Sequence, residues 1–349
     1  MVTNLMVFVI SLIGALVFTP LAKWLSNKTG ILDKPGFRKI HNQPIPRMGG
    51  EAILLAIGLG LIFYFPNQRE LWSVLGFAFL FVIFGLVDDA DIKIRARNKI
   101  LSHLLFSFLF IYFSGITLTF FSVNWLNWLV TACFITFMTN SMNMLDGMDG
   151  LVTGISCISA GFFAILAVNS GQLDLLLLSL AIMGGSLGFL RYNFNPASIF
   201  LGEAGSTLLG FLMAMLAVKL NIFTLWNIAL TLGIERLQII SFVVPLIILG
   251  IPIFDTYFVF SNRFLHRIKF SQPGKDHSHH RIHLMGFSQK ATVLTLYAVQ
   301  IVLGSIGLAM IRADIQQFFS LLLIVAVFFV SFTMLLLRVK VYEHNERPA

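Results

Sequence analysis

Two short acidic segments carry side chains that could hold a cation beside a phosphate group. The first is Asp88-Asp89-Ala90-Asp91, which follows an apolar run and places three carboxylates within four residues. Acids at the end of a helix oppose its macrodipole, so a bound cation would offset that cost. Both signs of charge suit a site for a metal ion and phosphates, although a solvated helix end is the alternative interpretation. Four basic residues follow the acids, namely Lys93, Arg95, Arg97 and Lys99.

The second acidic segment covers residues 140–150. At about 100° per residue, Asn140, Asn143 and Asp146 fall on one face of a helix, so three oxygen-bearing side chains line its end. Two glycines then allow the chain to turn, which brings Asp149 back toward the same face. The pattern predicts a polar site at a helix end.

A third segment, residues 193–206, leads into an apolar run through small residues beside Glu203. The N-terminus of a helix attracts anions, and a carboxylate there can hold a divalent ion that bridges to a phosphate. An ordinary helix cap, with Glu203 in the first turn, is the alternative.

The histidines form a fourth candidate, because four of the eight lie between residues 277 and 283. Zinc is a rival interpretation, but no cysteine or second histidine cluster completes a four-ligand site. Neutral imidazoles at His277, His279 and His280, with the guanidinium of Arg281, can instead donate hydrogen bonds to phosphates. Asp255 is a further candidate because an acid inside an apolar span is rare.

The elements that must position these residues are membrane helices. The chain has 349 residues, of which 57% are hydrophobic and 11% charged, far from the near-quarter charged fraction of soluble domains. Helices of roughly 20 residues span a bilayer, and eleven apolar windows recur. We therefore predict an all-α polytopic membrane protein with a single domain over residues 1–349. The windows are 5–25, 49–65, 71–87, 100–114, 125–142, 151–168, 173–190, 204–220, 237–258, 290–311 and 318–338.

Basic residues predict the orientation of these spans. Of the 24 Lys and Arg residues, all but Arg69, Lys219, Arg236 and Arg312 fall on one side of the predicted membrane. Because cytoplasmic loops carry the excess of positive charge, the N-terminus is expected outside and the C-terminus in the cytoplasm. The acidic segments and the histidines then face the cytoplasm. The net charge of +8 records this topology, and no nucleic-acid partner is expected.

Taken together, the motifs resemble the polyprenyl-phosphate N-acetylhexosamine-1-phosphate transferases of glycosyl transferase family 4. The resemblance spans nearly the whole chain and keeps the order of the family's motifs. One position differs, since Glu203 stands where the family usually has aspartate. The histidines are followed by Arg281-Ile282, which favours the simple-sugar branch over the peptidoglycan-precursor branch. The matching segments are Asp33 to Gly50, Asp88-Asp89, Asn140 to Leu151, Asn193 to Ser206, Pro252 to Asp255 and His277 to His280.

The resemblance implies a phosphotransferase in the bacterial cytoplasmic membrane. It would transfer a sugar 1-phosphate, with GlcNAc 1-phosphate favoured, from a UDP-amino sugar to polyprenyl (undecaprenyl) phosphate. UMP would be released in a first step of lipopolysaccharide or teichoic-acid synthesis. The resemblance also implies Mg²⁺, with Mn²⁺ as an alternative ion, and leaves the oligomeric state open, a homodimer included.

The resemblance further implies roles for individual residues. Asp88, Asp89, Asp146 and Asp149 would be the catalytic acids. Asp146 and Glu203 would bind the metal, and Asp88 and Asp89 would position the lipid phosphate. Phe200 would stack on uracil. The other implied substrate-binding residues are Asn140, Asn143, Asp149, Asn193, His277, His279, His280 and Arg281.

Two other classes remain as alternatives at this point. An intramembrane prenyltransferase would also use Asp clusters and Mg²⁺, but its acids usually recur at one-turn intervals on two helices. An ion-coupled transporter would need acids near the bilayer midplane. Here the acids collect at one face.

Overall fold

The computed structural model describes residues 2–34, 43–62, 69–92, 94–269, 274–339 and 341. Lys93, residues 35–42 of the matching segment Asp33 to Gly50, and the end of the second window lie outside these residues. The chain is 78% helical, which confirms an all-α membrane protein. The elements are α1 (Val2–Thr29), β1 (Leu32–Asp33), β2 (Ile45–Pro46), α2 (Gly49–Ile62), α3 (Arg69–Asp89), α4 (Ala96–Ser114), α5 (Asn124–Leu145), α6 (Leu151–Asn169), α7 (Leu173–Asn193), α8 (Gly202–Lys219), η1 (Phe223–Leu225), α9 (Trp226–Thr231), α10 (Leu237–Ser241), α11 (Val243–Ile248), α12 (Gly250–Leu265), α13 (Ser278–Leu284), α14 (Gln289–Met310) and α15 (Ile315–Leu337).

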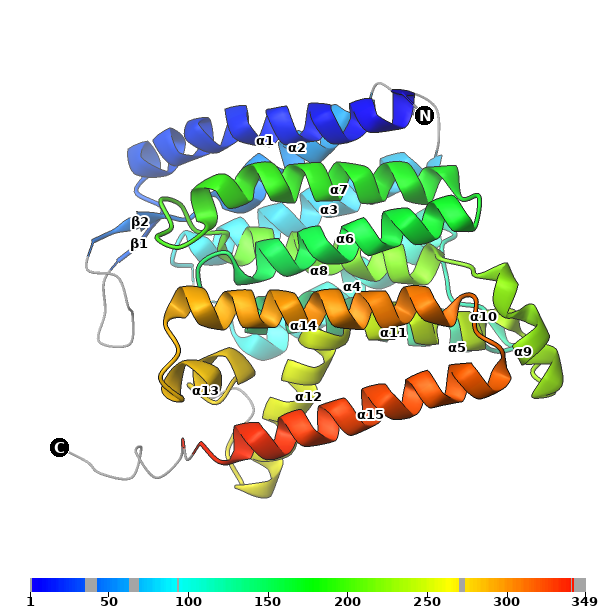
Figure 1. Cartoon of the computed structure of the whole chain (residues 1–349). Helices are drawn as coiled ribbons and strands as arrows, with labels where there is room; N and C mark the ends of the chain where they lie inside the picture. Colours follow the sequence, from blue (N-terminus) through cyan, green and yellow to red (C-terminus); the bar gives the residue numbers. More distant parts are fainter. Residues whose placement is uncertain are drawn as a thin grey trace.

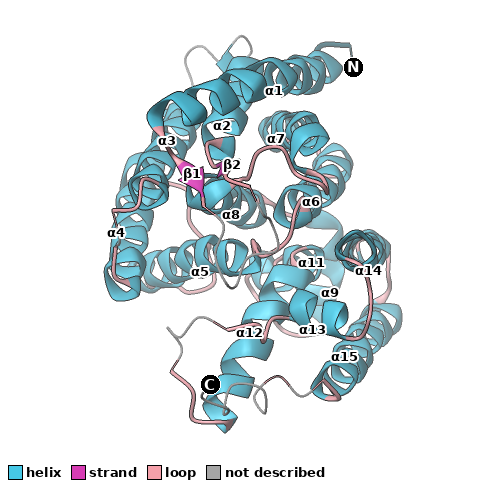
Figure 2. Ribbon diagram, turned by 90° about the vertical axis from the view of Figure 1, so that its left-hand side faces the viewer, coloured by secondary structure: helices cyan, strands magenta, loops and turns pink. Residues whose placement is uncertain are grey.

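The long helices run side by side, and α8 lies at their centre (Figures 1 and 2). It packs against α2, α3, α5 and α6, and nearly every one of its residues is buried. Glycines allow this close packing. A Cβ atom on Gly85 of α3 would lie 2.4 Å from Cα of Ala204, and one on Gly210 of α8 would lie 2.6 Å from Cα of Thr139. The helix is apolar on all sides because other helices surround it.

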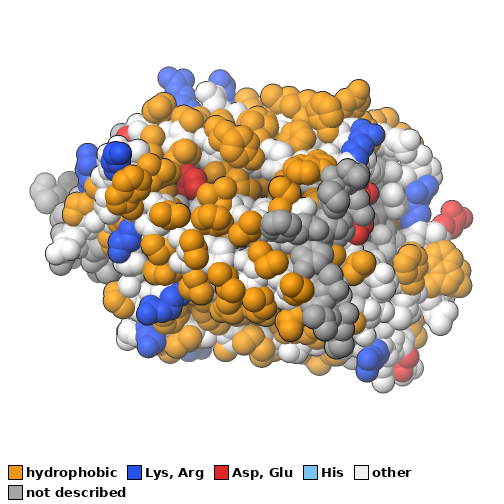
Figure 3. Space-filling view, turned by 90° about the horizontal axis from the view of Figure 1, so that it is seen from above, with side chains coloured by type: hydrophobic (Ala, Val, Ile, Leu, Met, Phe, Trp, Pro, Cys, Tyr) orange, Lys and Arg blue, Asp and Glu red, His pale blue; other side chains and the backbone are white. Residues whose placement is uncertain are grey.

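The outer surface of the bundle is apolar. Figure 3 shows hydrophobic side chains over the middle of one face, with Lys and Arg mostly toward the two ends. Leu323 and Met334 of α15, for example, expose 65% and 64% of their surface. Such a large exposed apolar area fits contact with lipid.

Fewer of the described helices are long and apolar enough to span a membrane than the eleven predicted. Within the described residues, six helices are long and apolar enough to cross a membrane, or up to eight if two bent pairs each form one span. Residues 237–258 are not one continuous helix, because the chain bends by 82° between Leu237–Ile248 and Gly250–Leu265. Pro245 and Pro252, which lack a backbone N–H, stand near the starts of α11 and α12. The count of eleven and the orientation stay predictions.

Candidate active site

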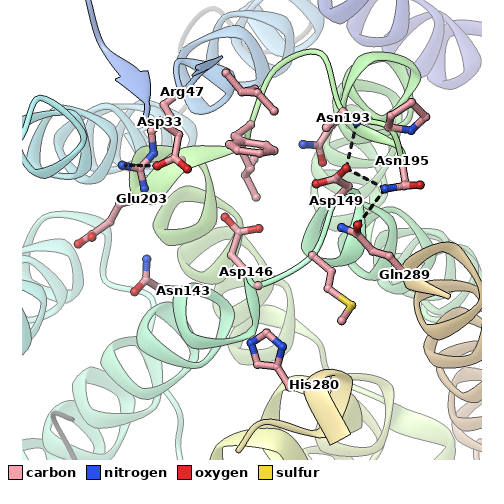
Figure 4. Close-up of a pocket in the computed structure, with 18 residues that line it drawn as sticks. Asp33, Arg47, Asn143, Asp146, Asp149, Asn193, Asn195, Glu203, His280 and Gln289 are labelled. Carbon is pink, nitrogen blue, oxygen red and sulfur yellow. Dashed lines mark hydrogen bonds and ion pairs between the residues drawn. The ribbon is translucent and has the colours of Figure 1, made fainter. Parts of the chain in front are cut away.

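A cavity of about 550 Å³ lies at the end of the bundle that carries the two short strands and α13. Segments far apart in the sequence form its walls. In Figure 4, Asp33, Arg47 and Glu203 lie on one side and Asp149, Asn195 and Gln289 on the other, with Asp146 between them. The predicted site residues that line the cavity are Asn143, Asp146, Asp149, Asn193, Phe200, Glu203 and His280.

The turn between α5 and α6 places two of these acids. Helix α5 ends at Leu145, and Gly150 takes a positive φ of 76° that lets α6 begin immediately. Burial raises the pKa of Asp146 to about 7; Arg47 opposes the rise, and the Asp89 and Asp149 carboxylates add to it. Burial thus disfavours the charged form of Asp146.

Asp149 organises the opposite wall of the cavity. Its Oδ2 atom accepts hydrogen bonds from Asn195 Nδ2 and from the backbone N–H of Ala197, both at 3.0 Å. Asn195 Nδ2 also donates to Gln289 Oε1 at 3.0 Å, which ties the α7–α8 segment to the start of α14. Asn193 also holds the α7–α8 segment, because its Nδ2 donates a hydrogen bond to the carbonyl of Ile199.

The neighbouring acids Asp88 and Asp89 have different hydrogen-bond partners, and neither lines the cavity. Asp89 is 3% exposed and accepts hydrogen bonds from the backbone N–H groups of Glu203 and Ala204, each at 3.0 Å. It therefore caps the N-terminus of α8 from another helix. Asp88 instead accepts a hydrogen bond from Lys99 Nζ at 2.8 Å.

The start of α13 rests on one buried acid. Asp255 Oδ2 lies 2.7 Å from His277 Nδ1, while Oδ1 accepts from the backbone N–H of Ser278 at 2.7 Å and from its hydroxyl at 2.6 Å. Asp255 is fully buried. It holds the turn that begins the helix carrying His280.

The three histidines occupy different environments. Burial would lower the pKa of His277, but the Asp255 carboxylate raises it above the usual value. His279 is fully buried against the α5–α6 turn, where a Cβ atom on Gly147 would lie 2.3 Å from its Nε2 atom. His280 alone of the three lines the cavity. Burial lowers the pKa of His280 to about 4, so its imidazole is neutral at pH 7.

Two predicted substrate-binding residues point elsewhere in this structure. The guanidinium of Arg281 is buried and donates to the backbone carbonyls of Leu336 and Val339 at the end of α15. Asn140 Nδ2 donates to the carbonyl of Thr136 and lies 3.2 Å from His103 Nδ1. Both side chains join helices behind the cavity.

Comparison with known proteins agrees with this arrangement. The sequence profile described as glycosyl transferase family 4 matches residues 71–221. A probable undecaprenyl-phosphate N-acetylglucosaminyl 1-phosphate transferase of Bacillus subtilis is 32% identical over 94% of this chain and 90% of its own length. The chain belongs to glycosyl transferase family 4.

Two other relatives carry related names. The undecaprenyl-phosphate alpha-N-acetylglucosaminyl 1-phosphate transferase of Escherichia coli K12 is 28% identical, over 93% of this chain and 90% of its own length. A phospho-N-acetylmuramoyl-pentapeptide-transferase of Caldicellulosiruptor bescii is also 28% identical, over 88% of this chain and 96% of its own. This family 4 protein is a sugar-phosphate transferase. The prenyltransferase and transporter alternatives are set aside by this membership.

Sequence reasoning assigned no role to four polar residues that line this cavity, namely Asp33, Arg47, Asn195 and Gln289. Asp33 and Arg47 belong to a segment that resembles the family's, but the resemblance gave neither residue a role. Asn195 lies within the third candidate segment without a role of its own, and Gln289 carried no signal, because amides in turns and at helix starts are common. Only contacts between distant segments identify them.

Proposed function

We propose that this family 4 enzyme transfers an N-acetylhexosamine 1-phosphate, with GlcNAc 1-phosphate favoured, from a UDP-sugar to polyprenyl phosphate at the cytoplasmic membrane face. The names of its relatives support this reaction. The observation that carries the proposal is the single cavity that gathers Asp146, Asp149, Glu203 and His280 at one end of an apolar bundle. A soluble nucleotide and a membrane lipid can meet only at such an end.

The reaction requires little covalent chemistry from the protein. An oxygen of the lipid phosphate attacks the sugar-bearing phosphorus of the UDP-sugar, and the bond from that phosphorus to the bridging oxygen breaks. UMP leaves with that oxygen. A phosphate monoester has a second pKa of about 6, so the lipid phosphate is mostly dianionic and no strong general base is needed. The protein must position two anions and stabilise their charge.

The charge of the cavity supports a divalent cation. Four carboxylates line it, at Asp33, Asp146, Asp149 and Glu203, whereas Arg47 is the one Lys or Arg among the described lining residues. Glu203 Oε1 is buried and has no hydrogen-bond partner among the described residues. An anionic nucleotide would be repelled unless a cation entered with it.

The residues present fit Mg²⁺ held partly by the substrate. Among the described residues, no three His, Cys, Asp or Glu side chains already converge as a metal centre. Mg²⁺ usually takes one or two carboxylates and completes its shell with water and substrate phosphates. Asp146 and Glu203 would hold it, and it would neutralise charge on the transferring phosphate.

The remaining assignments divide the cavity between the parts of the nucleotide sugar. Phe200 offers an aromatic face to uracil, and Asp149 lies on the wall that would receive the nucleoside. His280 can donate one hydrogen bond to the diphosphate as a neutral imidazole. Its position across the cavity from Arg47 supports this role.

The test is a product assay on membranes that contain the protein. Labelled UDP-GlcNAc, UDP-GalNAc and UDP-N-acetylmuramoyl-pentapeptide are each offered with undecaprenyl phosphate and Mg²⁺. The proposal expects UMP and a lipid-linked diphosphate sugar, with the largest rate for UDP-GlcNAc. Release of UDP would instead indicate an ordinary glycosyltransferase. Membranes carrying Asp146→Asn serve as the control for background activity.

A further inference from the structure

The N-terminus of α8 was expected to attract a substrate anion, but a carboxylate of the protein already accepts hydrogen bonds there. Asp89 accepts hydrogen bonds from the second and third backbone N–H groups of this helix, those of Glu203 and Ala204. A phosphate in the cavity therefore cannot use these donors. Beside a bound cation, positive charge from the protein itself must come from another part of the cavity wall.

Arg47 lies at that place. It follows β2, lines the cavity, and has a side chain that is 32% exposed. Its Nη1 atom lies 3.2 Å from Asp33 Oδ1, and its Nε atom lies 3.6 Å from Asp89 Oδ1. Two acids thus hold the guanidinium near the N-terminus of α8. One of them, Asp89, is itself held by hydrogen bonds from backbone N–H groups of that helix.

The backbone around Arg47 is joined to the segment that enters α8. The N–H of Phe200 donates to the carbonyl of Pro46 at 2.8 Å, and the N–H of Gly49 donates to the carbonyl of Phe200 at 3.2 Å. Gly202 takes a φ of 75°, and a Cβ atom there would lie 2.7 Å from the Arg47 carbonyl oxygen. Arg47 and Glu203 are therefore placed by one rigid junction.

From this geometry we propose that Arg47 is a catalytic residue that binds a phosphate group of the substrates. The inference rests on the proposed function and adds a residue that carries positive charge to it. A guanidinium has five N–H donors in a planar fork that matches two phosphate oxygens. His280, with a pKa of about 4, supplies no positive charge at pH 7. Arg47 is thus the permanent cation of the described cavity wall.

The experiment compares Arg47→Gln and Arg47→Lys with the wild-type enzyme in detergent. Isothermal titration calorimetry measures binding of UMP and of uridine, which lacks the phosphate. We expect Arg47→Gln to weaken UMP binding by about 10- to 100-fold and to leave uridine binding unchanged. Arg47→Lys keeps the charge but loses the forked N–H donors of the guanidinium. Its UMP affinity should therefore lie between those of wild type and Arg47→Gln. Arg312→Gln, an exposed arginine outside the cavity, is the matched control.

Turnover then identifies which phosphate is bound. Loss of UMP affinity places Arg47 on the nucleotide, whereas a raised KM for the lipid phosphate with unchanged UMP binding places it on the lipid. Either result supports the inference. If Arg47→Gln does not fold, Arg47→Lys decides alone, with melting temperature measured beside binding.

The outcomes separate the two proposals. If the wild-type enzyme prefers UMP to uridine and both Arg47 variants keep that preference and the KM values, the role of Arg47 is wrong while the proposed function stands. If the wild-type enzyme shows no preference for UMP and no release of UMP, both proposals fall.

Discussion

Lys99 Nζ lies 2.6 Å from Glu203 Oε2 and so joins α4 to the first turn of α8. The same ammonium group lies 2.8 Å from Asp88 Oδ2. In Figure 4 the carboxylate of Glu203 points away from Asp146. A metal ion held by both acids would therefore compete with Lys99 for Glu203.

This competition predicts opposite effects of two substitutions. Glu203→Gln removes the charge of a proposed carboxylate ligand, so a higher Mg²⁺ concentration should be needed for activity and for thermal stabilisation. Lys99→Met removes the competing ammonium, so half of the Mg²⁺-induced shift in melting temperature should occur at a lower concentration. Glu203→Asp is the control that keeps the charge and should retain measurable activity. Identical Mg²⁺ titrations for wild type and Glu203→Gln would contradict the ligand assignment.

Substitutions of Asp88 and Asp89 should change the free energy of unfolding by different amounts. Asp89→Asn places an NH₂ group or a weaker acceptor against the N–H groups of α8, so the free energy of unfolding should fall by about 1–2 kcal/mol. Asp88 is partly exposed, and its main partner Lys99 keeps a second acid, so Asp88→Asn should change that free energy by less than about 1 kcal/mol. Thermal unfolding in detergent checks both values. A larger loss for Asp88→Asn would contradict the cap.

Gly147→Ala tests the contact between the α5–α6 turn and α13. The new methyl group would lie 2.3 Å from Nε2 of the fully buried His279, so the helix must shift, at a cost of about 1–3 kcal/mol. Gly76→Ala, at a helical position with open space around it, is the matched control and should not destabilise the protein. Adding His279→Ala to Gly147→Ala should recover part of the loss. A purely additive double variant would show that the two residues do not interact.

The His277–Asp255 pair predicts a pH dependence of stability. The pKa of His277 is raised in the folded protein, so folding stabilises the protonated form. That contribution is complete below the unfolded value of about 6.5 and is lost as the pH rises through the higher folded pKa. Melting temperatures at about pH 6 and pH 8.5 should therefore differ more for wild type than for His277→Gln. Equal differences would remove His277 from this effect.

The predicted orientation can be tested with single cysteines after Cys133→Ser and Cys157→Ser. Asn27 follows the predicted first window, 5–25, on the expected cytoplasmic side, and Gln316 lies in the first turn of α15 on the other side. Both residues are exposed. In intact cells, an impermeant thiol reagent should label the Gln316→Cys variant and spare Asn27→Cys until the membrane is opened. The reverse pattern would place the cavity outside the cell.

The sequence alone determined that the chain is an all-α membrane protein, because an apolar run of helical length is a local property of the chain. Most of the expected windows coincide with single helices, and 237–258 breaks where Pro245 and Pro252 interrupt the hydrogen-bond ladder. The motifs also indicated the family, since its residue types and spacing lie within short segments.

Only the tertiary structure decided which of these residues face the cavity. Asp88 and Asp89 are neighbours, yet Asp89 is committed to backbone N–H groups 114 and 115 positions away. His279 and His280 are also neighbours, and only His280 reaches the cavity. A side chain at a helix end takes the direction that its distant partners allow, because buried polar groups must find hydrogen bonds. Local spacing carries no information about those partners. For the same reason, the position of Arg47 in the cavity depends on how the segment after β2 packs against the start of α8.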